Sequence, residues 1–233
     1  MGRNPPPIRT PQSTAAVRPL SEAEPLLLAS GSPRRREILA NLGVPTLVSA
    51  VDVDESIQPG EMPHTYLVRI VAAKLAAASS PFARSAAAAR GDTLQGINVA
   101  SAAGAVLVAD TSVIADDHIL GKPTGPEDAE RMIAQLAGKT HEVWTRFAVG
   151  APESPARTLH EETVKTRVTF RSLTAEQVRA YVASGEGIDK AGAYAIQGRG
   201  AGLVSRIEGS YSNVVGLPAC EVIVALEALG LWQ

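Results

Sequence analysis

A basic segment at residues 30–36 has the composition of a phosphate-binding site. It reads SGSPRRR and lies where an expected strand over 26–30 gives way to an expected helix over 33–42. Its three arginines fall in the first helical turn, where they oppose a helix dipole that favours anions. A bound polyanion would make this arrangement favourable, because backbone N–H groups, serine hydroxyls and arginine forks would converge on phosphate oxygens. The alternative is a solvated basic turn.

Acidic side chains that could bind a divalent ion or activate water occur at two further places. Asp110, followed by Thr111, comes at the end of an apolar strand expected over 105–109. Ligands of open α/β sheets gather at such carboxyl ends. An acidic run at 52–55, which includes Glu55, follows a second expected strand, and oxygen-rich clusters suit Mg²⁺ or Mn²⁺. The alternatives are a turn-capping aspartate and a solvated loop.

Lysines near tight turns complete this set of candidate residues. They are Lys74, Lys122 in the GKP turn at 121–123, and Lys190 in the DKAG segment at 189–192. Cations that hold phosphates, carboxylates that hold a divalent ion and one carboxylate that activates water are together what metal-assisted chemistry on a phosphate ester requires.

Two glycine motifs that often bind nucleotides do not fit. The GKT triplet at 138–140 has Ile133 where a P-loop needs glycine, and it ends an expected helix instead of starting one. The glycine run at 198–202 has Leu203 at the last glycine position of a dinucleotide fingerprint and does not join a strand to a helix. Neither motif therefore indicates a nucleotide site.

Hydrophobic periodicity and turn residues predict alternating strands and helices, which favours an α/β or α+β fold. The expected strands are 26–30, 46–51, 105–109, a hairpin of 113–114 with 118–120, 141–149, 161–171 and 203–207. The expected helices are 33–42, 64–79, 126–137, 174–184 and 218–229. The first is expected to begin with Ser32 as its N-cap and Pro33 at the first helical position, and the fourth opens on a Thr174 and Gln177 capping box.

Composition excludes several classes of function. The chain has 233 residues, 22 basic and 24 acidic side chains and 4% aromatic residues, which argues against a basic or base-stacking nucleic-acid module. A single cysteine excludes an internal disulfide and a multi-cysteine zinc site. No run of 18 apolar residues and no signal-peptide core is present, so we expect a cytoplasmic protein that spans no membrane.

The chain is expected to form one domain with two additions. The proline-rich residues 1–25 are predicted to be a disordered N-terminal extension. Residues 26–233 are predicted to form the domain, with a flexible insertion at 79–105 that is rich in alanine and serine.

Six separated segments together are similar to a known family. They are LASGSPRR at 28–35, ADT at 109–111, GKP at 121–123, HEVWT at 141–145, DKAGAYAIQG at 189–198 and GSYSNVVGLP at 209–218. In order and spacing the chain resembles the Maf family of nucleoside triphosphate pyrophosphatases from about residue 26 to its end. The resemblance implies the fold of the inosine-triphosphate pyrophosphatases, with a long mixed sheet, flanking helices and a central cleft between two lobes. It also implies hydrolysis of a nucleoside triphosphate to monophosphate and pyrophosphate, a divalent metal and a homodimer.

The resemblance also suggests roles for individual residues. Asp110 matches the catalytic base that activates water, and Glu55 with Asp110 would hold Mg²⁺ or Mn²⁺. Asp189 falls in a matching cleft segment. The positions that match phosphate-binding residues are Ser30, Ser32, Arg35, Lys74, Lys122 and Lys190.

Three further positions separate the substrate groups of the family. Arg34, Thr111 and Gln197 resemble the group that acts on dTTP and UTP, whereas the 7-methyl-GTP group has tryptophan at the first position and glutamate near the third. A glutamine amide offers a donor and an acceptor to the O4 and N3–H edge of uracil or thymine. The alternatives are a 7-methyl-GTP-type enzyme and a non-catalytic nucleotide-binding regulator of cell division or septum formation. Where the substrate is dTTP or UTP, it can be a canonical or a modified pyrimidine nucleotide.

Overall fold

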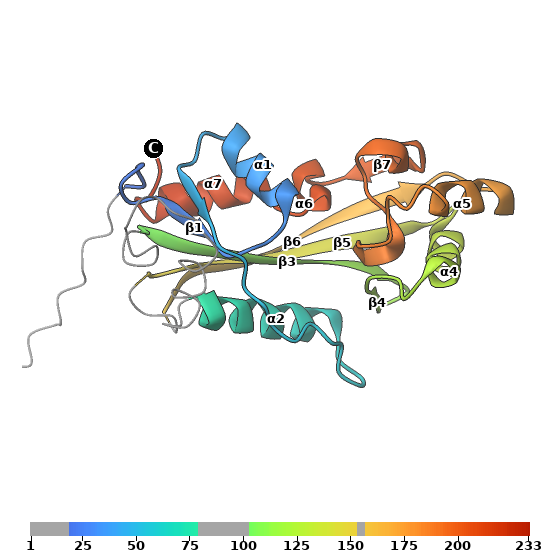
Figure 1. The fold of residues 1–233 in the computed structure, drawn as a ribbon, viewed down its shortest axis with the longest axis horizontal. Coiled ribbons are helices and arrows are strands. Elements are labelled where there is room, and N and C mark those ends of the chain that lie inside the picture. The colour runs from blue at the N-terminus through green and yellow to red at the C-terminus, as the bar shows by residue number, and fades with distance from the viewer. Residues whose placement is uncertain (1–18, 79–102, 153–156) are drawn as a thin grey trace, which may run out of the picture.

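The computed structural model describes residues 19–78, 103–152 and 157–233, which form a long mixed sheet flanked by helices (Figure 1). Its strands are β1 (Leu26–Leu28), β2 (Thr46–Val48), β3 (Ala105–Ala115), β4 (His118–Leu120), β5 (Thr140–Gly150), β6 (Thr158–Phe170) and β7 (Val204–Glu208). The strand order is β2-β1-β3-β5-β6-β7, with β4 paired to β3. β1 runs parallel to β2 and β3, and the other neighbours are antiparallel. The expected mixed α/β class is confirmed.

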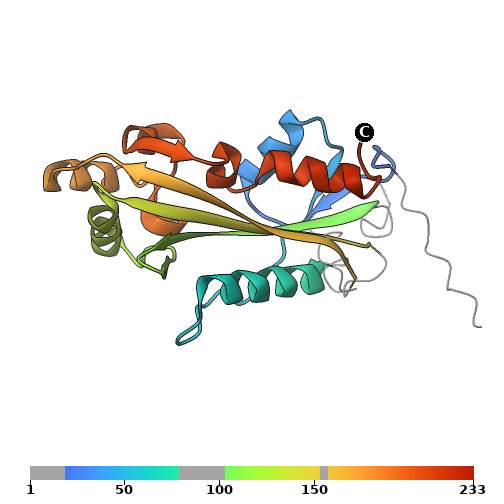
Figure 2. The same cartoon turned by 180° about the vertical axis from the view of Figure 1, so that it is seen from behind.

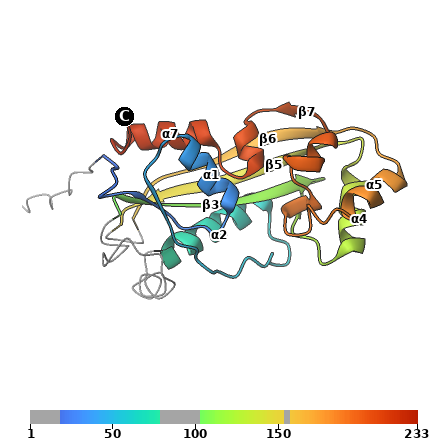
Figure 3. The ribbon, with the colours of Figure 1, turned by 45° about the horizontal axis from the view of Figure 1, so that its top comes forward.

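The helices cover both faces of this sheet. They are α1 (Pro33–Asn41), α2 (Pro63–Ala78), α4 (Pro126–Leu136), α5 (Ala175–Val182), α6 (Tyr211–Val215) and α7 (Ala219–Ala228), with 3₁₀ turns η1 (Ala191–Ala193) and η2 (Gly198–Gly202). α1 and α7 lie on one face at one end of the sheet and α2 on the other face (Figures 1 and 2). α4 and α5 lie at the far end (Figure 3).

Each end of the sheet has its own buried apolar cluster. One cluster packs α1 and α7 on the sheet through Leu39, Phe147 and Leu226. The other packs α4 and α5 on the opposite end through Ile133 and Phe170, among others. The molecule therefore has two lobes that share one continuous sheet, and functional side chains can meet between them.

β3 is longer than the sequence predicts. The expected strand over 105–109 and the first arm of the hairpin are one strand, because the polar residues between them continue the ladder, with Thr111 opposite Thr145 on β5. Asp110 consequently lies in the middle of β3 and not at its end. The pairing of β1 with β3 stops at Leu28 and Leu107, however, so Asp110 does lie just beyond the carboxyl end of the parallel part of the sheet.

Local signals in the sequence are confirmed at several turns and caps. The Ser32 hydroxyl caps α1 by accepting from the Arg35 N–H, and Thr174 and Gln177 form the predicted capping box on α5. The five-residue helix α6 was not predicted, because it lacks an apolar repeat.

The segment before β1 is packed on the domain. Leu20 is buried, and its N–H donates to the carbonyl of Leu231 at 2.8 Å. The packed part of the chain therefore starts before the expected boundary at residue 25. Residues 1–18 and most of the expected insertion lie outside the described residues. The helices of the described residues include no candidate for a membrane span.

Candidate active site

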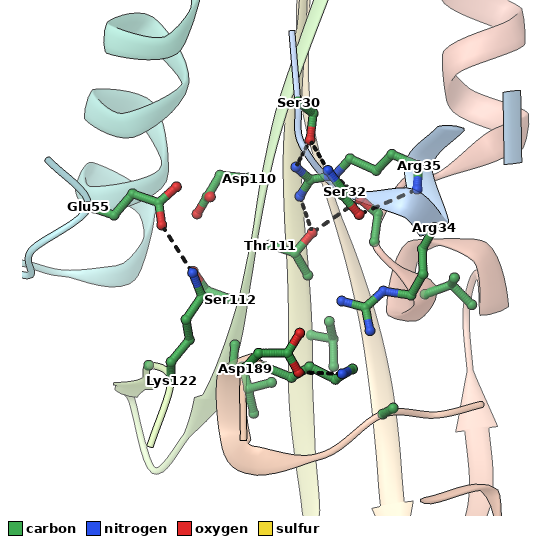
Figure 4. A pocket seen from close by; sticks show the side chains of 18 of the residues that line it. Ser30, Ser32, Arg34, Arg35, Glu55, Asp110, Thr111, Ser112, Lys122 and Asp189 are labelled. Carbon is green, nitrogen blue, oxygen red and sulfur yellow. Dashed lines mark hydrogen bonds and ion pairs between the residues drawn. The ribbon is translucent and has the colours of Figure 1, made fainter. Parts of the chain in front are cut away.

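A cavity of about 610 Å³ lies between the two lobes, around the point where the parallel strands end. Its lining includes all twelve site residues that the family motifs and the lysine turns indicate, most of which are labelled in Figure 4. They are Ser30, Ser32, Arg34, Arg35, Glu55, Lys74, Asp110, Thr111, Lys122, Asp189, Lys190 and Gln197. Arg36 is exposed and is not among the lining residues. The contacts of these side chains separate those that the protein itself engages from those that are available to a ligand.

Lys74 of α2 joins the two carboxylates of the cavity. Its Nζ lies 2.7 Å from Asp110 Oδ1 and 2.7 Å from Glu55 Oε1. The side chains of Lys74 and Asp110 are 9% and 11% exposed, whereas that of Glu55 is 40% exposed. On the open side, Lys122 Nζ lies 3.6 Å from Glu55 Oε2. The cavity thus has a buried, charge-compensated floor and a cation near its mouth.

The pKa of Glu55 reflects these neighbours. Burial raises the pKa of its carboxyl, but the hydrogen bond and charge of Lys74, with the charges of Lys122 and Arg35, outweigh burial and leave the pKa below its ordinary value. Glu55 is therefore ionised at neutral pH and can serve as an oxygen donor to a cation.

Arg35 is buried and is occupied by the protein itself. Its guanidinium donates to the carbonyl oxygens of Gly216 and Ala109 at 2.8 and 2.9 Å, and to the hydroxyls of Ser30 and Thr111 at 3.1 Å each. Four of the five N–H groups of an arginine are used in this way. Burial lowers the pKa of Arg35, and the charges of Asp110 and Glu55 oppose that effect. The fork that was expected to face phosphate instead holds α1, β3 and α6 together.

Arg34, one residue earlier, has the opposite character. It lines the cavity with its guanidinium in the open space (Figure 4), and in the described part of the chain its Nε has no hydrogen-bond partner. Together with a hydrogen bond from Lys190, the charge of Arg34 lowers the pKa of Asp189 on the far wall. An arginine with an Nε that lacks a hydrogen-bond partner beside a cavity is suited to bind an anion that the protein does not supply. Arg34 is therefore the arginine of this segment that is free to hold a ligand.

The serine hydroxyls near the arginines are oriented by the backbone. Ser30 Oγ accepts from the Ser32 N–H at 3.2 Å and from Arg35, and Ser32 Oγ accepts from the Arg35 N–H. Because each hydroxyl also has one donor, both O–H groups are left to donate to a ligand in this part of the structure.

The far wall of the cavity comes from the segment between α5 and β7. Lys190 Nζ donates to Asp189 Oδ1 at 2.5 Å and to the Glu186 carbonyl at 2.7 Å. The hydrogen bond from Lys190 lowers the pKa of Asp189. Gln197 immediately precedes η2 and is exposed at the cavity. This wall therefore offers an amide to a ligand, while Lys190 is largely engaged.

Comparison with known proteins places the chain in a family. A family model described as "Maf-like protein" matches residues 25–229. The chain belongs to the Maf-like family. A relative named dTTP/UTP pyrophosphatase from Moorella thermoacetica is 46% identical over 210 residues, which cover 89% of this chain and 97% of that protein. One of the same name from Geotalea uraniireducens is 44% identical over 207 residues, 88% of this chain and 95% of that protein.

Among solved structures, this Maf-like protein is similar to a nucleoside-triphosphatase / dITP/XTP pyrophosphatase from Mycobacterium abscessus. The TM-score is 0.34 and the identity 13%, over 88% of this chain and 93% of that chain. This likeness is too low to bear on the details of the site.

The donor set of the Maf-like cavity fits one kind of metal ion. In the described residues, no group of three or more His, Cys, Asp or Glu side chains could hold a metal by itself. Glu55 and Asp110 are the two carboxylates that line the cavity near Lys74. Mg²⁺ is commonly held by one or two carboxylates together with substrate phosphates and water, so this pair fits an ion that arrives with the substrate.

Sequence reasoning missed some residues of the Maf-like site. The Tyr66 hydroxyl donates to the Glu55 carbonyl at 3.1 Å, which fixes the loop of that carboxylate, and the buried Ser112 lines the cavity beside Asp110. Asn213 on α6 is not itself a lining residue, but it donates to the carbonyl of Val143, which lines the cavity, at 2.9 Å. Of these residues, only Asn213 could have been found from the sequence, because it lies in the 209–218 segment that resembles the family, but that segment indicated no role for it.

Proposed function

We propose that this protein hydrolyses dTTP and UTP, canonical or modified, to the monophosphate and pyrophosphate. The observation that carries the proposal is a buried Asp110 carboxylate on the cavity floor, held at 2.7 Å by Lys74, across a cavity from the unpartnered Arg34. The names of the relatives, which are 44–46% identical, support the reaction and the pyrimidine substrates.

The phosphate chain binds among the cations and hydroxyls of the cavity. Arg34 and Lys122 bring charge, and the Ser30 and Ser32 O–H groups donate to phosphate oxygens. Arg35 supports the segment of Ser30 and Ser32 from behind, and Lys190 lies on the far wall of the cavity. Glu55 and Asp110, together with the phosphates, would hold Mg²⁺ or Mn²⁺, and the ion would supply Lewis-acid stabilisation of the charge that develops at phosphorus.

Asp110 orients a water molecule for attack on the α-phosphorus and takes up its proton. A bond forms between the water oxygen and phosphorus, the bond to the bridging oxygen breaks, and pyrophosphate leaves with that bond's electron pair. Lys74 keeps Asp110 in place and compensates its charge. Thr111, which bonds Thr145 at 2.9 Å, fixes the strand next to Asp110.

Gln197 pairs with the O4 and N3–H edge of the pyrimidine base. Arg34 matches the position at which the 7-methyl-GTP group of the family has tryptophan. If these assignments are right, Arg34→Trp combined with Gln197→Glu shifts preference from UTP toward 7-methyl-GTP, the substrate of the alternative family group. An unchanged ratio of the two rates would contradict the assignment of both residues. A homodimer, which the family resemblance implies, and a cytoplasmic location, which the apolar pattern of the sequence predicts, remain expectations.

The proposed function is tested by pyrophosphate release from dTTP, UTP, CTP and GTP with Mg²⁺ or Mn²⁺. Asp110→Asn is expected to lower kcat at least about 100-fold, because the base is removed while the shape is kept. The control is Asp117→Asn, an exposed turn residue with a φ of 61° that asparagine also tolerates. Equal turnover by the two variants would refute the role of Asp110. If Asp110→Asn also kept a full effect on cell division, the regulator hypothesis would gain support.

A further inference from the structure

We infer that Glu186 is a positioning residue for base recognition, because its carboxylate holds the backbone of the loop that presents Gln197. The inference rests on the proposed function, since it needs Gln197 to face a base. Glu186 lies between α5 and η1, and its side chain does not line the cavity.

The Glu186 carboxylate is surrounded by donors from the loop. Oε2 accepts the Arg199 N–H at 2.8 Å, and Oε1 accepts the Gly200 N–H at 2.8 Å and the Tyr181 hydroxyl at 3.2 Å. The two peptide groups follow Gln197 closely in the chain, so fixing them fixes where its side chain begins. The Tyr181 hydroxyl also accepts the Ala195 N–H at 3.1 Å, which secures the loop on the other side of Gln197.

The glycine run that failed as a dinucleotide motif has its explanation here. A Cβ at Gly198 would lie 2.4 Å from Glu186 Oε2, and Gly198 has a φ of +67°. A Cβ at Gly200 would lie 1.8 Å from the Ala195 carbonyl oxygen. Only glycine therefore lets the backbone close around the carboxylate.

The same residue also ties down the neighbouring turn of the site. The Glu186 carbonyl accepts from Lys190 Nζ at 2.7 Å. Burial raises the pKa of the Glu186 carboxyl, but the hydrogen bonds from the Arg199 and Gly200 N–H groups outweigh burial and leave the pKa below its ordinary value. The carboxylate is therefore ionised at neutral pH and strengthens each bond that it accepts.

Polar bonds are important within η2, because this stretch between the buried Ile196 and Leu203 has no large apolar side chain of its own. Gln197 and Arg199 are exposed, and η2 is made of glycine, alanine and one arginine. Without the carboxylate, the loop is less ordered before binding and must lose conformational entropy when a nucleotide binds. This entropic cost weakens the binding of those substrates that contact Gln197. Loss of Glu186 should therefore weaken discrimination between bases more than it weakens the chemical step.

The test is Glu186→Gln, assayed by kcat/KM for UTP and for GTP. The glutamine side chain has the size of glutamate, but its NH₂ group cannot accept the N–H bonds that the carboxylate accepts. We therefore expect the ratio of kcat/KM for UTP to kcat/KM for GTP to fall about tenfold, which equals about 1.4 kcal/mol. KM for UTP is expected to rise while kcat stays within about threefold, and amide hydrogen exchange at 197–202 is expected to accelerate. The control is Glu176→Gln, the same change at an exposed position of α5, which should leave the ratio unchanged.

Two further variants separate positioning from a general loss of structure. In a Gln197→Ala background, Glu186→Gln should change the ratio no further, because the two residues act through one contact. Tyr181→Phe keeps the buried ring but removes the hydroxyl that donates to Glu186 and accepts the Ala195 N–H. It should shift the ratio in the same direction by less, because the two backbone bonds to Glu186 remain.

An unchanged ratio in a folded Glu186→Gln protein, or an additive effect in the Gln197→Ala background, would overturn the inference while the proposed function stands. A wild-type protein that hydrolyses none of the triphosphates would overturn the proposed function, and this inference with it.

Discussion

Removing the Lys74 ammonium should destabilise the protein strongly, because it leaves Asp110 buried without a partner. The side chains of Lys74 and Asp110 are 9% and 11% exposed and their atoms lie 2.7 Å apart. Removing one partner of a buried pair costs about 3–5 kcal/mol. The contact with Glu55 adds at most about 1 kcal/mol, because that carboxylate is 40% exposed and can be hydrated instead.

We therefore expect Lys74→Met to lower the free energy of unfolding by about 4 kcal/mol. For a domain of this size that is a fall in Tm of about 8–16 °C. The assay is urea unfolding at pH 7, followed by circular dichroism, with Tm as a second measure. Lys122→Met is the matched control, since that cation lies in the same cavity but is 64% exposed, and we expect a change within about 1 kcal/mol.

The double variant Lys74→Met with Asp110→Asn gives the sharper test. If the cost of Lys74→Met comes from an unpaired buried carboxylate, removing that charge as well should recover about 2 kcal/mol or more. A double variant no more stable than Lys74→Met would refute the electrostatic explanation and indicate lost packing instead. A Lys74→Met protein within about 1 kcal/mol of the wild type would show that the pair contributes little.

Two other predictions follow from the buried groups. Arg35→Leu should lower the free energy of unfolding, measured in urea, by at least about 3 kcal/mol, because hydrogen bonds from a charged donor are worth about 1.5–3 kcal/mol each. Arg34→Ala should leave the free energy of unfolding unchanged and raise KM for UTP. Equal losses of stability in the two variants would contradict the different roles of the two arginines. Burial lowers the pKa of His141 from 6.5 to about 4, so the unfolded chain binds that proton first. The contribution of His141 to the free energy of unfolding is therefore fully present above about pH 7, and it decreases by up to about 3 kcal/mol as the pH falls toward 4. His141→Gln should lack that component, measured as the difference in urea unfolding between pH 7 and pH 5.

The sequence predicts best those features of this fold that depend on neighbouring residues. The Ser32 cap, the capping box of α5 and the turn at Asp116 and Asp117, with φ of 51° and 61°, were all readable because each needs only a few adjacent side chains. The full length of β3 was not predictable from its apolar pattern. Its polar centre is held in strand form by β5, which lies about 30 residues away in the chain.

The site shows the same division between local and long-range information. The candidate site residues named from the sequence line the cavity, but the sequence did not show what each one contacts, and it did not indicate Tyr66 or Ser112. The position of Lys74 in the sequence carries no sign that it joins Asp110 to Glu55. That role arises only when α2 packs across the sheet, because the two carboxylates come from a loop and from a strand that are far apart in the chain.

Arg34 and Arg35 show why a motif alone does not assign chemistry. Adjacent residues on a helix point about 100° apart, so one arginine of the pair turns inward toward β3 and α6 while the other faces the cavity. The guanidinium of the inward residue, Arg35, donates to the carbonyls of Gly216 and Ala109. These two carbonyls belong to two other of the six similar segments, 209–218 and 109–111. Arg35 thus holds the segments in register, and Arg34 is left as the cation with capacity for phosphate. A run of arginines next to a strand therefore predicts an anion site. Which arginine binds the anion depends on the rest of the fold, because the arginine that receives backbone carbonyls as partners is no longer available to a ligand.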